Sequence, residues 1–172
     1  MNNTKTKPNI DPKNKWISWI VSNIQHYNHQ KYWKRREIVV NTNNKTPKLI
    51  KLLYLFYIKR CDAYNNASMG TNMNQGAYYA TPPILPHGLN GIIVHYNARF
   101  GKNCTIYQQV TIGGKNSKAA NIGDNVSIGA GAKIIGGVNI GNNVIIGANT
   151  VVTKDIPDDS IVVGASMRII NN

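Results

Sequence analysis

The chain of 172 residues has few acidic residues, few cysteines and no long uninterrupted hydrophobic run. Its two cysteines, Cys61 and Cys104, do not suggest the disulfide framework of a small secreted domain. No Cys and His cluster has the spacing of metal ligands, so we expect no metal site. The longest apolar run, Leu49 to Ile58, is interrupted by Lys51 and is too short to cross a bilayer.

The first twelve residues are polar and rich in asparagine, and they contain no apolar core of the kind that a secretory signal peptide needs. Together with the lack of a membrane-spanning run, this favours a soluble cytoplasmic protein. We therefore expect residues 1–12 to be a disordered lead that takes no part in the fold.

Acidic residues are scarce mainly in the first third of the chain. Residues 1–60 hold 13 Lys and Arg against Asp11 and Glu37, whereas the remainder is nearly balanced, and the net charge of the whole is +13. A basic region attracts anionic partners, and peripheral contact with a membrane is one reading. The other reading is a solvated helix face. Because no nucleic-acid-binding motif accompanies the charge, we expect no nucleic-acid partner.

A repeat of six residues dominates the rest of the chain. Large apolar side chains recur at this spacing in two series, which are Val94, Phe100, Ile106 and Ile112, then Ile122, Ile128, Ile134, Ile140, Ile146 and Val152. Glycine follows many of them, and a small or β-branched residue comes four positions later. This period fits neither an amphipathic helix nor an alternating strand. It predicts a coil of short strands, three to a turn, whose stacked turns bury one continuous core.

Two breaks in the period predict loops that leave the coil. Ile112 and Ile122 are ten residues apart, so about four extra residues lie among residues 115–121. Leu85 and Val94 are nine apart, so three extra residues lie between them. An earlier, fainter series, Ala67, Met73, Tyr79 and Leu85, suggests an irregular first coil. Loops on a rigid scaffold are common sites of binding and catalysis.

The segment before the coil is expected to be helical. Trp16, Ile20, Ile24 and Tyr27 have helical spacing within residues 13–29, and a second helix is expected over about 30–40. A third helix is expected from Pro47, a favourable first-turn residue, to near Cys61. The expected organisation is a helical region over 13–62, a coil over 63–163 and a tail over 164–172.

His87 is the strongest candidate for chemistry. It lies in the loop between Leu85 and Val94 and is followed by Gly88 and Gly91. A histidine held on a rigid scaffold is suited to general-base catalysis, because it can accept a proton near neutral pH. His95, His26 and His29 are weaker candidates, because they lie at an expected corner or near the end of an expected helix.

The motifs Asn103-Cys-Thr-Ile-Tyr-Gln-Gln-Val-Thr-Ile-Gly-Gly114 and Ile122-Gly-Asp-Asn-Val-Ser-Ile-Gly-Ala-Gly-Ala-Lys-Ile-Ile-Gly136 resemble those of the hexapeptide-repeat acyltransferases, in the serine acetyltransferase-like branch. The resemblance covers about residues 60–170. It implies a mainly β fold, a left-handed parallel β-helix, behind the small helical region. It also implies that His87 matches the catalytic histidine of the family. Because Pro86 stands in place of the aspartate before that histidine, we expect a backbone carbonyl or Asp62 to orient the imidazole.

Acetyl-CoA is the co-substrate that the resemblance implies. It would pass the corners at Gly129, Ala130 and Ala148, with its phosphates near Lys133 and Arg168. Asn90 and Gln108 are expected to bind the acceptor. Two departures from the family pattern stand out, because Pro86 replaces an aspartate and Ala119 stands at the position of a second active-site histidine.

We therefore expect a CoA-dependent O-acetyltransferase that acts on a sugar hydroxyl, as in surface or capsular polysaccharide synthesis. The alternatives are serine O-acetylation, which belongs to cysteine biosynthesis, and a non-catalytic β-helix assembly protein. The resemblance further implies a homotrimer, with pairing into a hexamer through the N-terminal helices as a variant.

Overall fold

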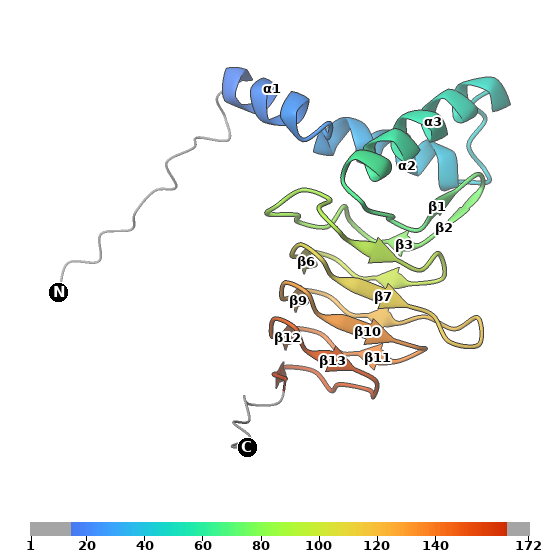
Figure 1. Ribbon diagram of the computed structural model, residues 1–172. Helices are drawn as coiled ribbons and strands as arrows, with labels where there is room; N and C mark the ends of the chain where they lie inside the picture. The colour runs from blue at the N-terminus through green and yellow to red at the C-terminus, as the bar shows by residue number, and fades with distance from the viewer. Residues whose placement is uncertain (1–14, 165–172) are drawn as a thin grey trace, which may run out of the picture.

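The computed structural model describes residues 15–164, which form a helical cap on one end of a β-helix (Figure 1). The cap consists of α1 (Lys15–Ile24), α2 (His29–Val40) and α3 (Lys48–Tyr64). The Asn28 side chain accepts a hydrogen bond from the Lys31 N–H at 2.9 Å and so caps the start of α2. The buried residues of α2, among them Tyr32, Arg36 and Val39, recur every three or four positions and form its inner face.

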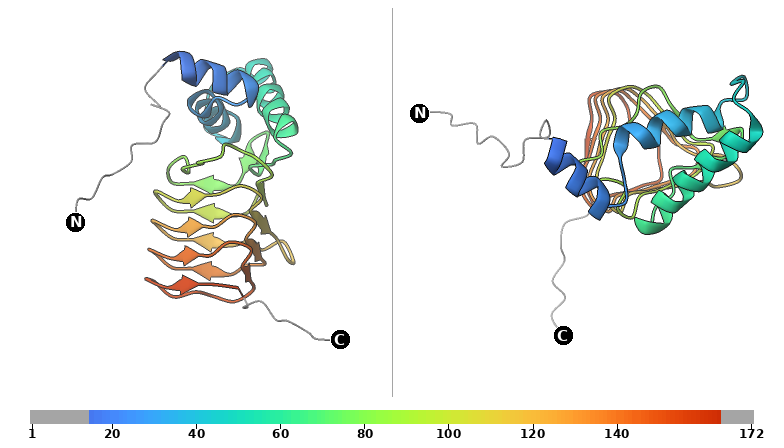
Figure 2. Two further views of the ribbon diagram at one scale, coloured as in Figure 1. Left: turned by 60° about the vertical axis from the view of Figure 1, so that its left-hand side comes forward. Right: turned by 90° about the horizontal axis from the view of Figure 1, so that it is seen from above.

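The β-helix has three faces, each a parallel sheet of four short strands. One face contains β4 (Ile93–Val94), β7 (Thr111–Gly113), β10 (Lys133–Ile135) and β13 (Val151–Val152). The second contains β3 (Tyr78–Tyr79), β5 (Arg99–Phe100), β8 (Asn121–Ile122) and β11 (Asn139–Ile140). The third contains β6 (Thr105–Ile106), β9 (Ser127–Ile128), β12 (Ile145–Ile146) and β14 (Ile161–Val162). Seen from above, the coils superimpose in one outline (Figure 2).

The strand register places the six-residue series inside the coil. Ile134 pairs with Ile112 and with Val152, and Ile128 pairs with Ile106 and Ile146, so identical positions of successive coils are stacked. All ten members of the two series are buried. The stack of inward side chains continues toward the helical cap, where the Tyr79 and Phe100 rings lie parallel with centroids 4.6 Å apart. The expected fold class, a left-handed parallel β-helix with a small N-terminal helical region, is confirmed.

Glycine at the corners is required by the spacing of the coils. A Cβ atom on Gly123 would lie 2.7 Å from the carbonyl oxygen of Gly141 in the next coil. Because real Cβ atoms do not approach a carbonyl so closely, any other residue would force the coils apart. Both cysteines are buried and free, and Cys104 occupies the small inward position four residues after Phe100.

Both predicted loops are present. Residues 86–91, here called the His87 loop, lie between the bridge at Ile84 and strand β4. The second loop turns through an antiparallel bridge between Lys115 and Lys118. Each stands at a different corner of the coil.

The first coil differs from the predicted register. Ser68 bridges to Ile93, so Met69, which is fully buried, occupies the inward position above Val94. Met73 instead lies in a hairpin formed by β1 (Thr71–Asn72) and β2 (Gln75–Gly76). The hairpin adds four residues to the usual six between the inward positions Met69 and Tyr79. The six-residue spacing of Ala67 and Met73 gave no sign of this insertion.

The helix bounds also differ from those predicted. The first helix ends at Ile24 and not near residue 29, because His26 has a left-handed φ of 50° and Asn28 caps the start of α2. The third helix continues past Cys61 to Tyr64. The expected lead over 1–12 and most of the expected tail over 164–172, including Arg168, lie outside the described residues.

Candidate active site

The corner between the third and first faces brings most of the predicted site residues onto one edge. Backbone hydrogen bonds tie the successive corners along this edge. The Gln109 N–H donates to the Asn90 carbonyl at 2.9 Å, the Gly131 N–H to the Gln108 carbonyl at 2.9 Å, and the Asn149 N–H to the Ala130 carbonyl at 2.8 Å. We call this row of corners the site edge. His87, Asn90, Gln108, Gly129, Ala130 and Ala148 belong to it, and Lys133 begins the strand that follows it.

The His87 loop holds an exposed histidine on a fixed backbone. Leu89 and Ile92 are fully buried and anchor the loop to the core, whereas His87 itself is exposed. Gly88 and Gly91 have φ of 65° and 66°, a conformation that favours glycine. The Gly91 N–H donates to the Asn65 carbonyl at 2.9 Å, which ties the loop to the end of α3. The imidazole is thus accessible while its backbone is held on both sides.

A cavity of about 330 Å³ opens beside His87. Its lining combines the His87 loop with the helical cap and includes His26, Tyr64, Asn66 and Asn90. The His26 ring stacks on the Tyr64 ring with centroids 3.9 Å apart. On the coil side, the Tyr107 ring lies 6.1 Å from the His87 ring between centroids. The cavity therefore presents two histidines and several amide side chains, which suit a small polar ligand.

The sequence did not reveal the part played by His26 and Tyr107. His26 is a weak candidate in the sequence because it lies near the end of an expected helix, about sixty residues before His87. The turn at His26, with its positive φ, and the contact of α3 with the His87 loop bring the two histidines to one cavity. Tyr107 directly precedes Gln108, and only the stacking of coils places it beside His87.

Asp62 does not contact His87. Its Oδ1 atom accepts a hydrogen bond from the Tyr32 hydroxyl at 2.7 Å inside the cap, and no hydrogen bond joins it to His87 in the described part of the chain. Asp62 is buried, and burial raises its pKa to about 6, against the lowering effect of the Tyr32 hydrogen bond. The contacts of Asp62 thus assign it to the cap and do not support its predicted role as the orienting group.

The lower part of the site edge has small corners and one cation. Gly129, Ala130 and Ala148 leave the edge without bulky side chains. The Lys133 ammonium donates to the Gln109 carbonyl at 2.7 Å, which uses one of its three N–H donors. Gly131 has a φ of 70°, and a Cβ atom there would collide with Asn149 Oδ1. A narrow chain ending in phosphates, such as that of CoA, fits this combination.

The other expected positions lie away from the site edge. His95 follows β4 at the next corner, where its Nδ1 accepts the Asn97 N–H at 3.1 Å and its ring adjoins Gly114. Ala119, which stands where the resemblance places a second histidine, is buried beside the 115–118 loop. Within residues 15–164, no group of three or more His, Cys, Asp or Glu is placed to hold a metal ion.

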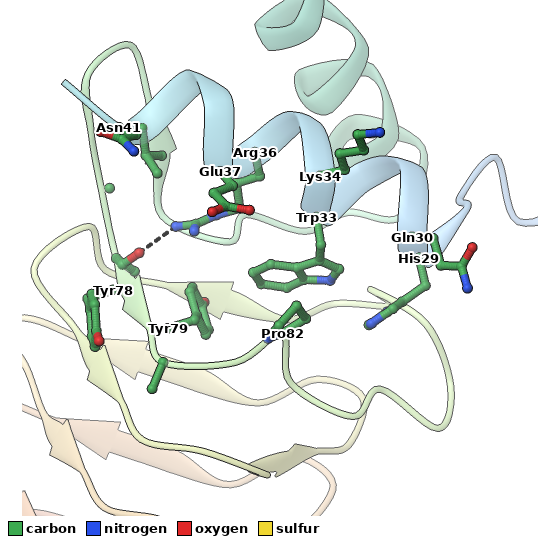
Figure 3. A pocket seen from close by; sticks show the side chains of 14 residues that line it. His29, Gln30, Trp33, Lys34, Arg36, Glu37, Asn41, Tyr78, Tyr79 and Pro82 are labelled. Carbon is green, nitrogen blue, oxygen red and sulfur yellow. Dashed lines mark hydrogen bonds between the residues drawn. The ribbon is translucent and has the colours of Figure 1, made fainter. Parts of the chain in front are cut away.

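A larger cavity, of about 670 Å³, lies between α2 and the first coil but does not include His87 (Figure 3). Trp33 and Tyr79 lie in its floor, and His29, Lys34 and Glu37 border it. Arg36 reaches from α2 to donate to the Ala77 carbonyl at 2.6 Å. Cavity size alone therefore does not identify the candidate site, because the His87 loop lines the smaller of the two cavities.

Comparisons with known proteins show what this chain is similar to. The family described as bacterial transferase hexapeptide (six repeats) matches residues 119–154. The serine acetyltransferase of Staphylococcus xylosus is 41% identical over 105 residues, which cover 59% of this chain and 48% of that protein. The chain is therefore similar to hexapeptide-repeat transferases over residues 119–154 and to serine acetyltransferases over 105 residues. It spans about half the length of the curated relatives it matches.

Solved structures extend the likeness through the helical cap. A serine acetyltransferase in complex with CoA superimposes with a TM-score of 0.62 at 26% identity, covering 82% of this chain and 55% of that one. The Neisseria gonorrhoeae serine acetyltransferase in complex with serine gives a TM-score of 0.58 at 28% identity, covering 87% and 54%. The likeness therefore includes most of the residues described here, not the repeats alone.

Proposed function

We propose that this protein is an acetyl-CoA-dependent O-acetyltransferase with His87 as its general base. One observation carries the proposal. The exposed His87 stands on the same edge as the small corners at Gly129, Ala130 and Ala148, with Lys133 beside them. A proton acceptor and a row of small corners that could accommodate a thioester donor thus lie along one edge of the coil.

The proposed reaction is attack of an acceptor hydroxyl on the thioester carbonyl carbon. The His87 imidazole takes the hydroxyl proton as the new C–O bond forms, the C–S bond then breaks, and the proton passes to the leaving thiolate. Such general-base catalysis is typically worth ~10²–10⁴-fold. Backbone N–H groups of the glycine-rich corners are suited to meet the oxyanion. Water or a backbone carbonyl remains to orient the imidazole, because Asp62 is bound to Tyr32.

The acceptor is proposed to occupy the cavity between His87 and His26, where Asn90 and Asn66 supply amide groups for its polar atoms. Gln108 lies one coil below on the same edge. The donor would extend from His87 past Gln108 toward Ala148, with its phosphates at Lys133. The two substrates then approach His87 from opposite ends of one edge.

L-serine is the first acceptor to test, because the relatives are serine acetyltransferases and one solved relative was crystallised with serine. The relatives thus favour serine over the sugar acceptor that the sequence predicts. A sugar is the second candidate acceptor, and one observation favours it. Ala119 is buried and Pro86 precedes His87, so two polar groups that the resemblance associates with serine are lacking.

Assembly as a homotrimer is part of the proposal. The similarity to serine acetyltransferases supports an oligomer, and the three flat faces of the coil suit side-by-side packing around a threefold axis. Pairing of trimers through the helical cap would require exposed apolar residues there, and Trp19 on α1 is 61% exposed.

Thiol release from acetyl-CoA tests the function directly. The purified protein is supplied with acetyl-CoA and either L-serine or each of a panel of neutral and acidic sugars. Release that depends on one acceptor, with the acetylated product identified by mass spectrometry, is the expected result. No release with any acceptor, together with no binding of CoA by calorimetry, would overturn the proposal and favour a non-catalytic assembly protein.

A further inference from the structure

The longest helix of the cap, α3, buries two charged side chains and exposes several large apolar ones. Its buried face carries Lys51 and Asp62, which are 6% and 4% exposed, beside the apolar Ile58 and Cys61. Its outer face carries Leu49, Leu53 and Phe56, which are 71%, 62% and 69% exposed. Helices of soluble proteins normally place these residue types the other way round.

The buried charges have specific partners, so the orientation of α3 is well determined. The Lys51 ammonium donates to the Asn41 carbonyl at 3.0 Å and to Asn74 Oδ1 at 3.2 Å, and Asp62 accepts the Tyr32 hydroxyl. From the neighbouring helix, the Arg35 guanidinium lies 4.2 Å from the centroid of the Tyr57 ring. Rotating α3 to bury its leucines would break all of these contacts at once.

Among the described residues, nothing packs over the large apolar side chains on the outer face of α3. Helix α3 packs against α2, and α2 contacts β1 and β2 at the end of the β-helix (Figures 1 and 2). Leu52, which is 46% exposed, completes an apolar strip with Leu49, Leu53 and Phe56, here called the α3 strip. A continuous strip of exposed large apolar side chains marks an interaction surface.

The charges around the α3 strip are of one sign. Lys48, Lys59 and Arg60 are exposed on the same helix, and Asp62, its one acidic residue, is buried. The cap as a whole, residues 15–64, contains ten Lys and Arg against Glu37 and Asp62. An apolar strip bordered by cations is the pattern of a helix that lies in the interface of an anionic bilayer.

We propose that the α3 strip docks this protein on the surface of an anionic membrane, with the β-helix extending away from it. None of the described helices is long and apolar enough to cross a bilayer. A second copy of the chain fits the strip less well, because symmetric pairing would bring two sets of cations together. This surface is separate from the site edge, so the proposal is independent of the proposed function.

Sedimentation with lipid vesicles tests the proposal. The wild-type protein is mixed with vesicles of equimolar phosphatidylcholine and phosphatidylglycerol, or of phosphatidylcholine alone. We expect it to sediment with the anionic vesicles, less so as salt is raised, and only weakly with the neutral ones. Phe56→Glu should lower the partition coefficient roughly tenfold or more, since it removes an inserted aromatic side chain.

Ile161→Glu is the matched control. Ile161 is 71% exposed, like Phe56, but lies in β14 at the opposite end of the molecule. This variant should bind vesicles as the wild type does, and both variants should keep the wild-type melting temperature. Equal sedimentation of Phe56→Glu and wild type, or no sedimentation with anionic vesicles, would overturn the proposal. So would a smaller oligomer for Phe56→Glu in light scattering without lipid, which would make the strip a subunit interface.

Discussion

The Tyr32 hydroxyl donates a hydrogen bond to Asp62 Oδ1 at 2.7 Å, inside the contact between α2 and α3. The second carboxylate oxygen, Oδ2, is buried and has no hydrogen-bond partner in the described part of the chain. A carboxylate with one oxygen unsatisfied in a buried position is costly when ionised. This relationship links the stability of the cap to pH.

Asp62→Asn should therefore change how stability depends on pH. The pKa of Asp62 is raised from 3.8 to about 6, so its contribution to stability is fully present below the unfolded value and is lost as pH rises through about 6. This loss lowers the free energy of unfolding of the wild type by about 3 kcal/mol. Asparagine keeps an acceptor for Tyr32 and does not ionise. The free energy of unfolding of the variant, relative to that of the wild type, should therefore rise by about this amount between pH 4 and pH 8. Denaturant unfolding at both pH values measures the difference, and a constant difference would contradict the assignment.

The interior of the β-helix should not tolerate charge. Ile134 is fully buried between Ile112 and Val152, and Ile134→Asp would bury an unpaired carboxylate at a cost of several kcal/mol. Its neighbour Ile135 points outward and is 37% exposed, so Ile135→Asp should cost far less. Thermal unfolding followed by circular dichroism compares the two. Equal melting temperatures would show that the strand register is wrong.

The sequence predicts repeated contacts of this fold better than contacts that occur once. The apolar series through Ile134 was predictable because each inward position has the same environment in successive coils, so the six-residue spacing indicates the coil directly. The Met69 position was missed because a hairpin interrupts the spacing before Tyr79. His87 was identified by its loop and by the resemblance. Its neighbour His26 was not, because their meeting depends on the turn between α1 and α2, which no local pattern encodes.

Lys133 should matter for the donor. If its ammonium meets the phosphates of acetyl-CoA, Lys133→Ala should raise the KM for acetyl-CoA roughly tenfold, the effect of one charge-assisted hydrogen bond. Lys102→Ala is the control, because Lys102 is exposed at a different corner of the coil. Initial rates at varied acetyl-CoA concentration separate the two variants. An unchanged KM in Lys133→Ala would place the donor elsewhere.

His26 should matter for the acceptor. It lines the cavity beside His87 and stacks on Tyr64, so His26→Ala should raise the KM for the acceptor several-fold and leave the KM for acetyl-CoA unchanged. Tyr64→Leu, which removes the stacking partner, should have a smaller effect in the same direction. Should only the KM for acetyl-CoA change, the positions of the two substrates along the site edge would be reversed.

The central claim is that His87 is the general base, and the turnover of His87→Ala tests it most directly. The substitution is at an exposed loop position, so the melting temperature and acetyl-CoA binding should stay close to wild type, while turnover falls by ~10²-fold or more. His95→Ala, at a corner away from the site edge, should retain most of the activity. If His87→Ala keeps more than about half of the wild-type turnover, well outside the range for loss of a general base, the account of this site is wrong.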